Sequence, residues 1–376
     1  MKIVVAPDKF KGSLPAAQVA DAIAAGLRTA LPSAEVVTIP VADGGDGTVD
    51  AAVAAGFEQV PVTVDGPTGE PVRASYARRG EVAVVELAST CGLSRLPGGR
   101  REPLTASSFG AGQALAAALE AGARRIVFGV GGSASTDGGA GLLQALGARV
   151  LDARGDPLGR GGAALRDVAA LDLAGLHPAL RTCSVILATD VANPLTGPDG
   201  AAEVYGPQKG ATPDQVRELA SGLSRWAAVV AEATGTDLSQ APGAGAAGGV
   251  GFAALAVLGA EPRPGIGLVL DLAGFDAALD GAALVITGEG SLDTQTLAGK
   301  APMGVAQAAA RRGIPVVAVA GRSTLTEGER ARTGITAVYT LSDLEPDPAR
   351  SSSQAGVLLR RVGRAVARDR LAGARP

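Results

Sequence analysis

Short apolar segments alternate with amphipathic ones at both ends of the chain. Residues 2–7 predict a strand, and residues 15–31 predict a helix that begins with a serine and a proline near its first turn. A second strand is predicted at 35–41 and a second helix at 48–55. Strands that alternate with helices in this way predict a parallel sheet with right-handed crossovers.

The pattern changes in the middle of the chain and then returns. Residues 58–87 hold three closely spaced β-rich segments, at 60–64, 72–76 and 82–87, with turn signals between them, which predicts antiparallel hairpins. Less regular elements follow: helices at 106–121, 140–146, 214–233 and 250–258, and strands at 124–130, 148–152 and 184–189. Regular alternation resumes at about 282, with strands at 283–287, 315–320 and 335–340 and helices at 302–312 and 352–371.

The composition excludes several classes of protein. The chain has 376 residues, of which 47% are hydrophobic, so it is long enough for two domains and apolar enough to fold. A net charge of −3 and an aromatic content of 3% argue against nucleic-acid and acidic-membrane partners. The first apolar segment is too short for a signal peptide, and glycines and a proline interrupt the uncharged stretch 238–260. We therefore expect a soluble cytoplasmic protein.

Cysteine and histidine are too rare to carry the chemistry. Cys91 and Cys183 lie in apolar segments without metal-ligand spacing, which favours buried reduced thiols. The single histidine, His177, precedes a proline, where a surface or capping role is expected. A Ser-His-Asp triad and a structural zinc site are both disfavoured, so acid–base work falls to carboxylates and lysines.

The most informative feature is a set of glycine-rich loops that contain carboxylates and follow predicted strands. These loops are 7–13, 43–48, 131–139, 189–190 and 288–293. In open α/β sheets, ligands bind beyond the carboxyl ends of the strands. Backbone amides there hold phosphate, and carboxylates hold the cation that accompanies it. The pattern predicts an enzyme that acts on phosphorylated or nucleotide substrates.

Two loops near the amino terminus have a functional and a structural interpretation each. Asp43 and Asp46 stand among glycines at the start of a predicted helix, where amides can hold an anion, but a tight turn with a helix cap has the same sequence. Lys9 and Lys11 follow the first strand and can neutralise a carboxylate or a phosphate. A pair of solvated surface lysines is the alternative.

The loop after residue 130 allows a competing interpretation. Residues 129–134 resemble a weak dinucleotide-binding fingerprint, and Asp152 follows at the distance of a ribose-binding acid. Against this, residues 135–139 interrupt the helix that should begin at the glycines, which favours a loop around a phosphate chain.

Asp190, at a strand end, suits a general base or a cap. Glu289 stands between two glycines and is followed by Asp293 and Lys300.

Several of these segments together resemble the bacterial glycerate kinases of the first type, which include glycerate 2-kinases. The resemblance extends in order over nearly the whole chain, through residues 6–14, 42–48, 131–141, 190–195, 208–211 and 287–293. The chain departs from the family pattern at Lys9, Asp46 and Ser135-Thr136. Of these, Lys9 adds a charge where the family often has serine.

The resemblance implies a two-domain α/β fold and ATP-dependent phosphorylation of D-glycerate with Mg²⁺. A Rossmann- or flavodoxin-like parallel-sheet domain would consist of residues 1–62 and 282–376, with a mixed α/β domain, 63–281, inserted between them. The 2-position of glycerate is the hydroxyl that the resemblance favours. The oligomeric state stays open, a homodimer included.

The site residues follow from this resemblance and from the loops. Asp190 is the expected base, Asp293 is the second candidate, and Lys9 assists catalysis. The other expected roles are ATP binding by Gly131, Gly132, Ser133, Lys11 and Lys300, substrate binding by Asp8, Lys9 and Arg322, and Mg²⁺ binding by Asp43, Asp46 and Glu289. A 3-phosphoglycerate-forming kinase, an NAD-dependent hydroxy-acid oxidoreductase and a non-catalytic sugar-acid sensor remain as alternatives.

Overall fold

The computed structural model describes residues 1–371, which form an α/β protein with two compact units. The terminal unit contains Met1–Asp43, Asp50–Gly56 and the chain from Ile266 on, and the inserted unit contains Gly44–Val49 and Phe57–Gly265. The boundaries of the inserted unit differ from the predicted 63 and 281. Strand β3 (Glu58–Asp65) packs within the inserted unit, and helix α9 (Gly265–Leu272) packs within the terminal unit.

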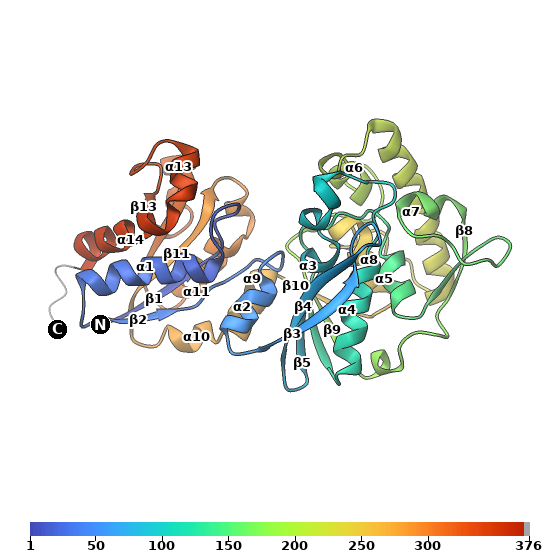
Figure 1. The fold of residues 1–376 in the computed structure, drawn as a ribbon, viewed down its shortest axis with the longest axis horizontal. Helices are drawn as coiled ribbons and strands as arrows, with labels where there is room; N and C mark the ends of the chain where they lie inside the picture. Colours follow the sequence, from blue (N-terminus) through green and yellow to red (C-terminus); the bar gives the residue numbers. More distant parts are fainter. Residues whose placement is uncertain (372–376) are drawn as a thin grey trace. The chain divides into compact units, whose positions relative to one another are not determined.

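The terminal unit has a five-stranded sheet whose strands are all parallel (Figure 1). Its order is β13-β12-β11-β1-β2, so the first strand lies between its sequence neighbour and a strand from the far end of the chain. The chain leaves β1 toward one edge and leaves β11 toward the other, which makes the gap between their carboxyl ends a switch point. The strands are β1 (Lys2–Pro7), β2 (Glu35–Thr38), β11 (Ala282–Leu292), β12 (Val316–Ser323) and β13 (Ile335–Thr340).

Helices cover both faces of this sheet because successive strand residues point to opposite sides. Ile3 and Val5 pack with α1 (Ala16–Ala30) and α14 (Ala355–Val366). Val4 and Ala6 pack on the other side. The helices on that side are α2 (Thr48–Ala54), α9 (Gly265–Leu272), α10 (Phe275–Ala278) and α11 (Ala301–Ala310).

Two glycines let α1 and α14 approach closely. A Cβ atom on Gly26 would lie 2.2 Å from the carbonyl oxygen of Arg360, and one on Gly363 would lie 2.4 Å from that of Ile23. The predicted final helix 352–371 is shorter and interrupted in the structure: α13 (Pro348–Ser353) precedes α14, and a π-helical turn follows at Ala367–Leu371. Leu358, Val362 and Val366 of α14 are buried.

The inserted unit has a six-stranded mixed sheet in the order β10-β9-β6-β5-β4-β3. The first four strands in that order run parallel, and β3, β4 and β5 form the predicted antiparallel meander. A separate hairpin contains β7 (Arg149–Asp152) and β8 (Val168–Asp172). The sheet strands are β3 (Glu58–Asp65), β4 (Pro71–Arg79), β5 (Val82–Glu86), β6 (Arg125–Gly129), β9 (Ser184–Ala188) and β10 (Glu261–Arg263).

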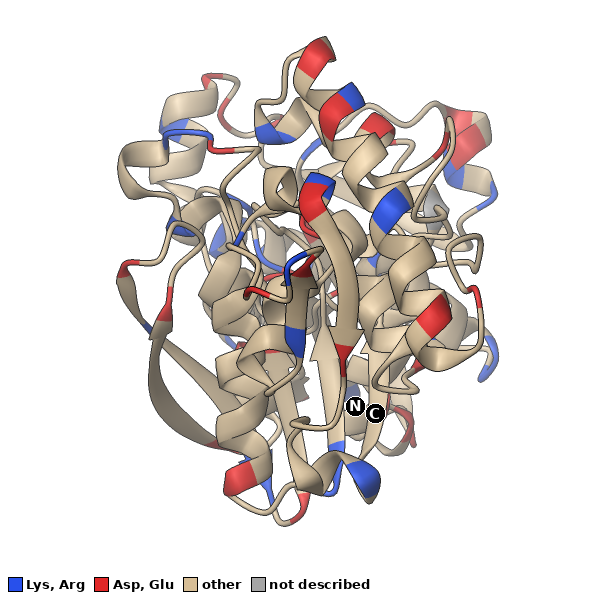
Figure 2. Cartoon of the chain, turned by 90° about the vertical axis from the view of Figure 1, so that its right-hand side faces the viewer, with Lys and Arg blue, Asp and Glu red and all other residues tan. Residues whose placement is uncertain are grey.

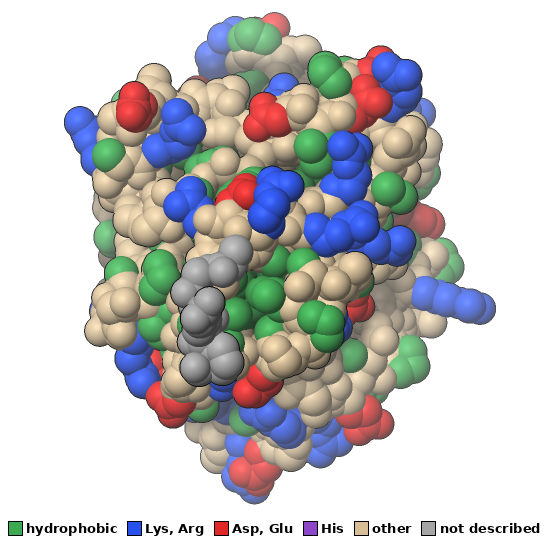
Figure 3. All heavy atoms as spheres, turned by 90° about the vertical axis from the view of Figure 1, so that its left-hand side faces the viewer, with side chains coloured by type: hydrophobic (Ala, Val, Ile, Leu, Met, Phe, Trp, Pro, Cys, Tyr) green, Lys and Arg blue, Asp and Glu red, His purple; other side chains and the backbone are tan. Residues whose placement is uncertain are grey.

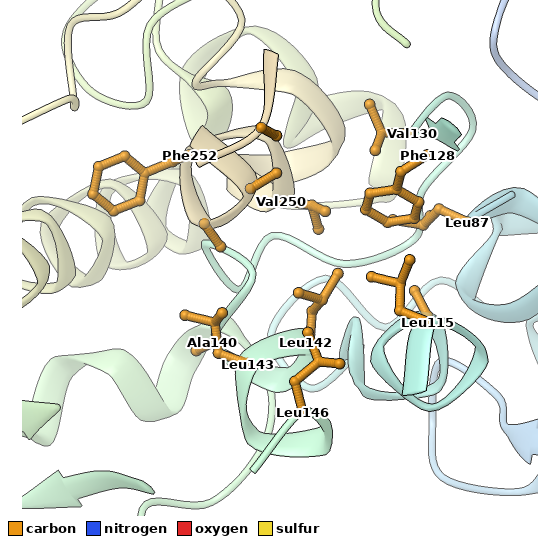
Figure 4. Close-up of a cluster of buried hydrophobic side chains, with 14 of the residues drawn as sticks. Leu87, Leu115, Phe128, Val130, Ala140, Leu142, Leu143, Leu146, Val250 and Phe252 are labelled. Atoms are coloured by element: carbon orange, nitrogen blue, oxygen red, sulfur yellow. The ribbon is translucent and has the colours of Figure 1, made fainter. Parts of the chain in front are cut away.

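One apolar cluster joins this sheet to its helices (Figure 4). Phe128 of β6 packs with Leu115 and Leu142, which come from two helices, and the buried Trp226 donates a hydrogen bond to the carbonyl of Gly138. The helices of this unit are α3 (Ala88–Cys91), α4 (Phe109–Glu120), α5 (Ala140–Ala145), α6 (Ala201–Tyr205), α7 (Pro213–Thr234) and α8 (Ala246–Ala256), and α12 (Glu327–Ala331) completes those of the terminal unit.

The surface carries both signs of charge. Figure 2 shows basic and acidic residues interspersed among the other residues, and Figure 3 shows apolar side chains in groups between charged ones. This mixture agrees with the small net charge of −3. None of the helices in residues 1–371 combines the length and hydrophobicity that a membrane crossing requires.

Candidate active site

The terminal unit gathers carboxylates at its switch point. Asp8 follows β1 directly, Glu289 lies near the end of β11, and Asp43 follows the strand at the next position in the sheet. Parallel strands bring these three positions to one edge, which is where open α/β sheets bind ligands. The predicted site residues Asp8, Asp43 and Glu289 are therefore brought together by the sheet order.

The carboxylates in this group disfavour one another's charged forms. The pKa of Asp8 is raised to about 7, first by burial and then by the nearby Asp43 and Glu289, while Lys9 acts in the opposite direction. The amide of Lys9 donates to Asp8 Oδ1 at 2.6 Å. A carboxyl group with such a perturbed pKa at a strand end is a candidate for function.

Glu289 is held by a short turn that follows β11. Thr296 Oγ1 donates to Glu289 Oε1 at 2.5 Å and accepts from the amide of Asp293 at 3.0 Å. Burial raises the pKa of Glu289, with Lys300 opposing the shift and Asp293 and Asp43 adding to it. The predicted residues Asp293 and Lys300 are thus electrostatic neighbours of Glu289.

A cavity of about 230 Å³ lies at the same end of the terminal unit's sheet. Lys11 and Arg322 bring positive charge to it, Phe10 and Leu341 supply apolar surface, and Glu345 adds a carboxylate. Arg322 Nε also donates to Ser291 Oγ at 3.3 Å. Two cations beside apolar walls suit a ligand with anionic groups and an apolar part.

The glycine-rich loop of the inserted unit follows β6 and is fixed from below. Asp137 is fully buried and accepts from the amide and the hydroxyl of Ser108 at 2.8 and 2.9 Å. The amide of Leu93 donates to the carbonyl of Gly132 at 2.9 Å. Gly132 is exposed and Gly131 is partly buried, whereas Ser133 is buried. Of the predicted phosphate-binding residues, the two glycines therefore form the accessible part of the loop.

Lys209 is a site candidate that sequence reasoning did not select. It is 3% exposed, and its Nζ donates to Ser133 Oγ at 2.8 Å and to the carbonyl of Ser135 at 2.5 Å. Burial lowers its pKa to about 7, an effect that Asp137 opposes. The sequence feature that could have indicated Lys209 is the family resemblance, because segment 208–211 is part of it. A lysine in a glycine-containing turn is, however, ordinarily exposed to solvent.

Glu86 is a second residue that the sequence did not indicate. Its Oε2 accepts from the amides of Gly47 and Val49 at 2.9 and 3.1 Å, at the start of α2. A buried carboxylate of the protein itself therefore binds the amides that were expected to hold an anion. The helix-capping interpretation of the 43–48 loop accounts for this part of the structure.

Asp190 is exposed and accepts from the amide of Gly265, the first residue of α9, through Oδ1 at 3.0 Å. This contact agrees with the capping role, and the general-base role stays a prediction. The predicted metal ligands come from both units, since Asp43 and Glu289 belong to the terminal unit and Asp46 to the inserted one.

The carboxylates suit a hard cation without forming a complete site for one. Within the described part of the chain, no three His, Cys, Asp or Glu side chains are grouped as metal ligands. Mg²⁺ characteristically takes one or two protein carboxylates and completes its shell with water and substrate phosphates. The oxygen chemistry and mutual repulsion of Asp8, Asp43 and Glu289 fit that mode of binding.

The structure contradicts the dinucleotide interpretation. Asp152 lies on β7, which pairs only with β8 in an antiparallel hairpin outside the six-stranded sheet. Its carboxylate accepts from the amides of Arg154 and Asp156 and so shapes a turn. A ribose-binding acid has to end a strand of the parallel sheet beside the glycine loop, so the prediction for Asp152 is wrong.

The predictions for cysteine and histidine largely agree with the structure. Cys91 is buried and burial raises its pKa to about 11, while Cys183 is only partly buried. His177 Nδ1 accepts from the amide of Ala179 at 3.3 Å and caps a short 3-10 helix, which confirms the capping role.

Comparison with known proteins gives one consistent result. Residues 3–371 match the model of the glycerate kinase family. The chain is 45% identical over 345 residues to the glycerate 2-kinase of Escherichia coli K12, with 91% of this chain and 90% of that protein covered. It is 44% identical over 344 residues to the glycerate kinase of Bacillus subtilis 168, with 91% and 90% covered.

The fold comparison agrees with the sequence comparison. A crystal structure from Salmonella typhimurium LT2, of a protein assigned as glycerate kinase 2, matches with a TM-score of 0.83 and 43% identity. The match covers 97% of this chain and 98% of that one.

Proposed function

This chain belongs to the glycerate kinase family, and from that premise we propose that it transfers the terminal phosphoryl group of ATP to the 2-hydroxyl of D-glycerate. The observation that carries the proposal is the 45% identity, over 91% of the chain, to a protein named glycerate 2-kinase. The product, 2-phosphoglycerate, would carry organic-acid carbon into glycolysis in the cytoplasm.

The terminal unit supports this reaction through charge. Phosphoryl transfer needs positioning and charge neutralisation more than covalent help from the protein. Lys11, Arg322 and Lys9 would bind anionic groups of ATP or glycerate, Asp8 a substrate hydroxyl, and Lys300 the nucleotide. Asp43 and Glu289 of the terminal unit would hold Mg²⁺, which supplies charge neutralisation at the phosphates when bound.

The inserted unit supports it through a rigid loop. The backbone of Gly131, Gly132 and Ser133 would contact a phosphate, and it is held by the bonds from the Leu93 amide to the Gly132 carbonyl and from the Ala134 amide to the Cys91 carbonyl. Asp190 would accept the proton of the attacking hydroxyl, with Asp293 as the second candidate. Asp190 also accepts from the amide of Gly265 through Oδ1.

An Asp190→Asn variant separates the two roles of Asp190. Asparagine caps helices as well as aspartate does, so the contact with Gly265 and the fold should survive. Loss of a general base lowers turnover by about 10²–10⁴-fold. A folded Asp190→Asn protein with wild-type kcat would eliminate Asp190 as the base and bring Asp293 forward.

The regiochemistry is tested on the product. D-glycerate and MgATP are supplied, and formation of phosphoenolpyruvate by enolase is followed with and without phosphoglycerate mutase. Signal without the mutase identifies 2-phosphoglycerate, and signal only with the mutase identifies a 3-kinase. Absence of both signal and ADP would reject the proposed reaction and leave the sensor as the remaining alternative. Light scattering on the same sample would settle whether the protein is a homodimer.

A further inference from the structure

Lys209 is a buried cation without an ion-pair partner in residues 1–371. It ends the short 3-10 helix η5 (Pro207–Lys209), and its amine donates only to a hydroxyl and a carbonyl. Burial of an ammonium group without a carboxylate partner costs several kcal/mol of folding free energy. An apolar side chain of similar length would fill the same space at lower cost, so the amine has a role beyond packing.

The backbone that packs against the Lys209 amine is tightly packed and has unusual dihedral angles. A Cβ atom on Gly248 would lie 2.8 Å from Lys209 Nζ and 2.1 Å from the carbonyl oxygen of Ser135. Ala247, Gly248 and Gly249 all have positive φ, and Ala247 is the one non-glycine residue in 1–371 that does. Such strain persists where the surroundings impose it, characteristically at functional sites.

Two buried hydroxyls beside the amine lack hydrogen-bond partners. Ser135 Oγ and Thr136 Oγ1 both belong to fully buried residues and have no hydrogen-bond partner among residues 1–371. Thr136 is also close to the amine, since its Cα lies 2.8 Å from the same Gly248 Cβ position. An ammonium group has three N–H donors, of which Lys209 uses two. The buried polar groups at the base of the loop therefore do not use all of their hydrogen-bonding capacity.

Small changes around Lys209 can change its protonation state near neutral pH. Burial lowers its pKa to about 7, and Asp137, on the loop, is the charged group that opposes this shift. From the other sides, Ala247–Gly249 carry no charge, Glu203 of α6 is exposed, and Arg101 donates to the carbonyl of Gln208. An anion placed on the Gly131–Ser133 loop above the amine would favour its ammonium form.

We propose that Lys209 is a positioning residue beneath the Gly131–Ser133 loop, which fixes Ser133 for a bound phosphate and takes up a proton when that phosphate arrives. The proposal rests on the proposed function, because it needs a phosphate group on this loop. The phosphate can belong to the nucleotide or to the phosphorylated product. Both sources present the same phosphate chemistry, and titration with MgADP and with 2-phosphoglycerate distinguishes between them.

Calorimetry measures the proton directly. MgADP, 2-phosphoglycerate and phosphate-free D-glycerate are titrated into the protein at pH 8, in buffers with different ionisation enthalpies. The wild type should take up a proton, up to about one per site, with whichever phosphate-bearing probe occupies the loop, and none with D-glycerate. Lys209→Met and Lys209→Arg should abolish the uptake, because the first has no amine and the second stays charged. Lys2→Met, a substitution of a lysine outside this loop, should leave it unchanged.

Kinetics give the second measurement. Lys209→Met should lower kcat/KM by about 10–100-fold, with the KM of the substrate that binds the loop rising most. Lys209→Arg keeps a positive charge and should recover part of this loss while removing one limb of the pH profile. Wild-type proton uptake and kinetics in Lys209→Met would overturn the proposal.

A third variant covers the case in which Lys209→Met does not fold. Ser133→Ala leaves the amine in place and removes one acceptor, so proton uptake should persist while binding of the phosphate-bearing probe weakens several-fold. Unchanged binding would overturn the positioning role. An active wild type that takes up no proton rejects this inference alone, whereas a wild type that forms no ADP from D-glycerate rejects the proposed function.

Discussion

The two units carry similar acidic loops at the ends of parallel strands and use the carboxylates in opposite ways. In the inserted unit, Glu86 and Asp137 are buried and accept hydrogen bonds from backbone amides. In the terminal unit, burial and the repulsion from neighbouring carboxylates, Asp43 among them, raise the pKa values of Asp8 and Glu289. A carboxylate that accepts hydrogen bonds from backbone amides stabilises the fold. Carboxylates that repel one another destabilise it unless a ligand or cation binds them, which indicates a functional site.

The largest effect should come from the terminal unit. Glu289→Gln removes a charge from the repelling group, so kcat should fall by about 10²–10³-fold, the loss typical for a group that stabilises charge in the transition state. The melting temperature should stay the same or rise, because a like-charge repulsion is lost. Steady-state kinetics and thermal melting measure the two effects. Glu327→Gln, on the exposed start of α12, is the matched control. A destabilised but active Glu289→Gln would contradict the comparison.

Asp137→Asn should show the reverse pattern in the inserted unit. The amide nitrogen of asparagine cannot accept the bonds that the Ser108 amide and hydroxyl now donate to Asp137 Oδ2. We expect the free energy of unfolding to fall by about 2–3 kcal/mol. Urea unfolding measures this change, with the exposed Asp167→Asn as control. Equal stability of wild type and variant would show that Asp137 is no structural acceptor.

Lys209 should make stability depend on pH. Its pKa is about 7 when folded and 10.5 when unfolded, so the unfolded chain binds more protons between these values. The free energy of unfolding should then rise with pH across this window, by at most about 1.4 kcal/mol per pH unit from this group. Denaturant unfolding at pH 7, 8 and 9 measures the slope. Lys209→Met should flatten it, and an equally steep slope in the variant would assign the effect to other groups.

The smallest effect should follow from Glu86→Gln. The glutamine oxygen can still accept from Gly47 or Val49, but the favourable charge at the start of α2 is lost. The free energy of unfolding should decrease by about 1 kcal/mol, with kcat close to that of the wild type. The same urea titration and kinetic assay decide this case. A kcat loss comparable to that of Glu289→Gln would remove the distinction between the two kinds of carboxylate.

Most of the regular elements could be predicted because their periodicity is strong and local. The predicted strands at 2–7 and 335–340 match β1 and β13, and the amphipathic helix α7 lies within one residue of its predicted bounds. Short elements such as β10 and α10 carry too few residues for a pattern to show. The hairpin partner β8 was also missed, because its pairing with β7 depends on contacts distant in the sequence.

The candidate site was predictable only where its residues stand close to the ends of predicted strands. Asp8 directly follows β1 and Glu289 lies near the end of β11, and the sheet order makes them neighbours. Lys209 could not be selected, because its burial depends on a strained turn of α8 and on Ser133 and Ser135, all distant in sequence. Asp152 matched a spacing rule, but its strand joins a different sheet. Spacing along the chain cannot decide which sheet a strand enters.

The position of β1 in its sheet also sets the order in which the chain can fold during synthesis. β1 is the first strand to be made, yet one of its two partners, β11, begins at Ala282. At about 5–20 residues per second, the ribosome needs on the order of 15–60 s to complete the intervening chain. The continuous stretch Phe57–Gly265 emerges in that interval and can fold first. An apolar strand with one edge unpaired for that long is a natural binding site for a chaperone.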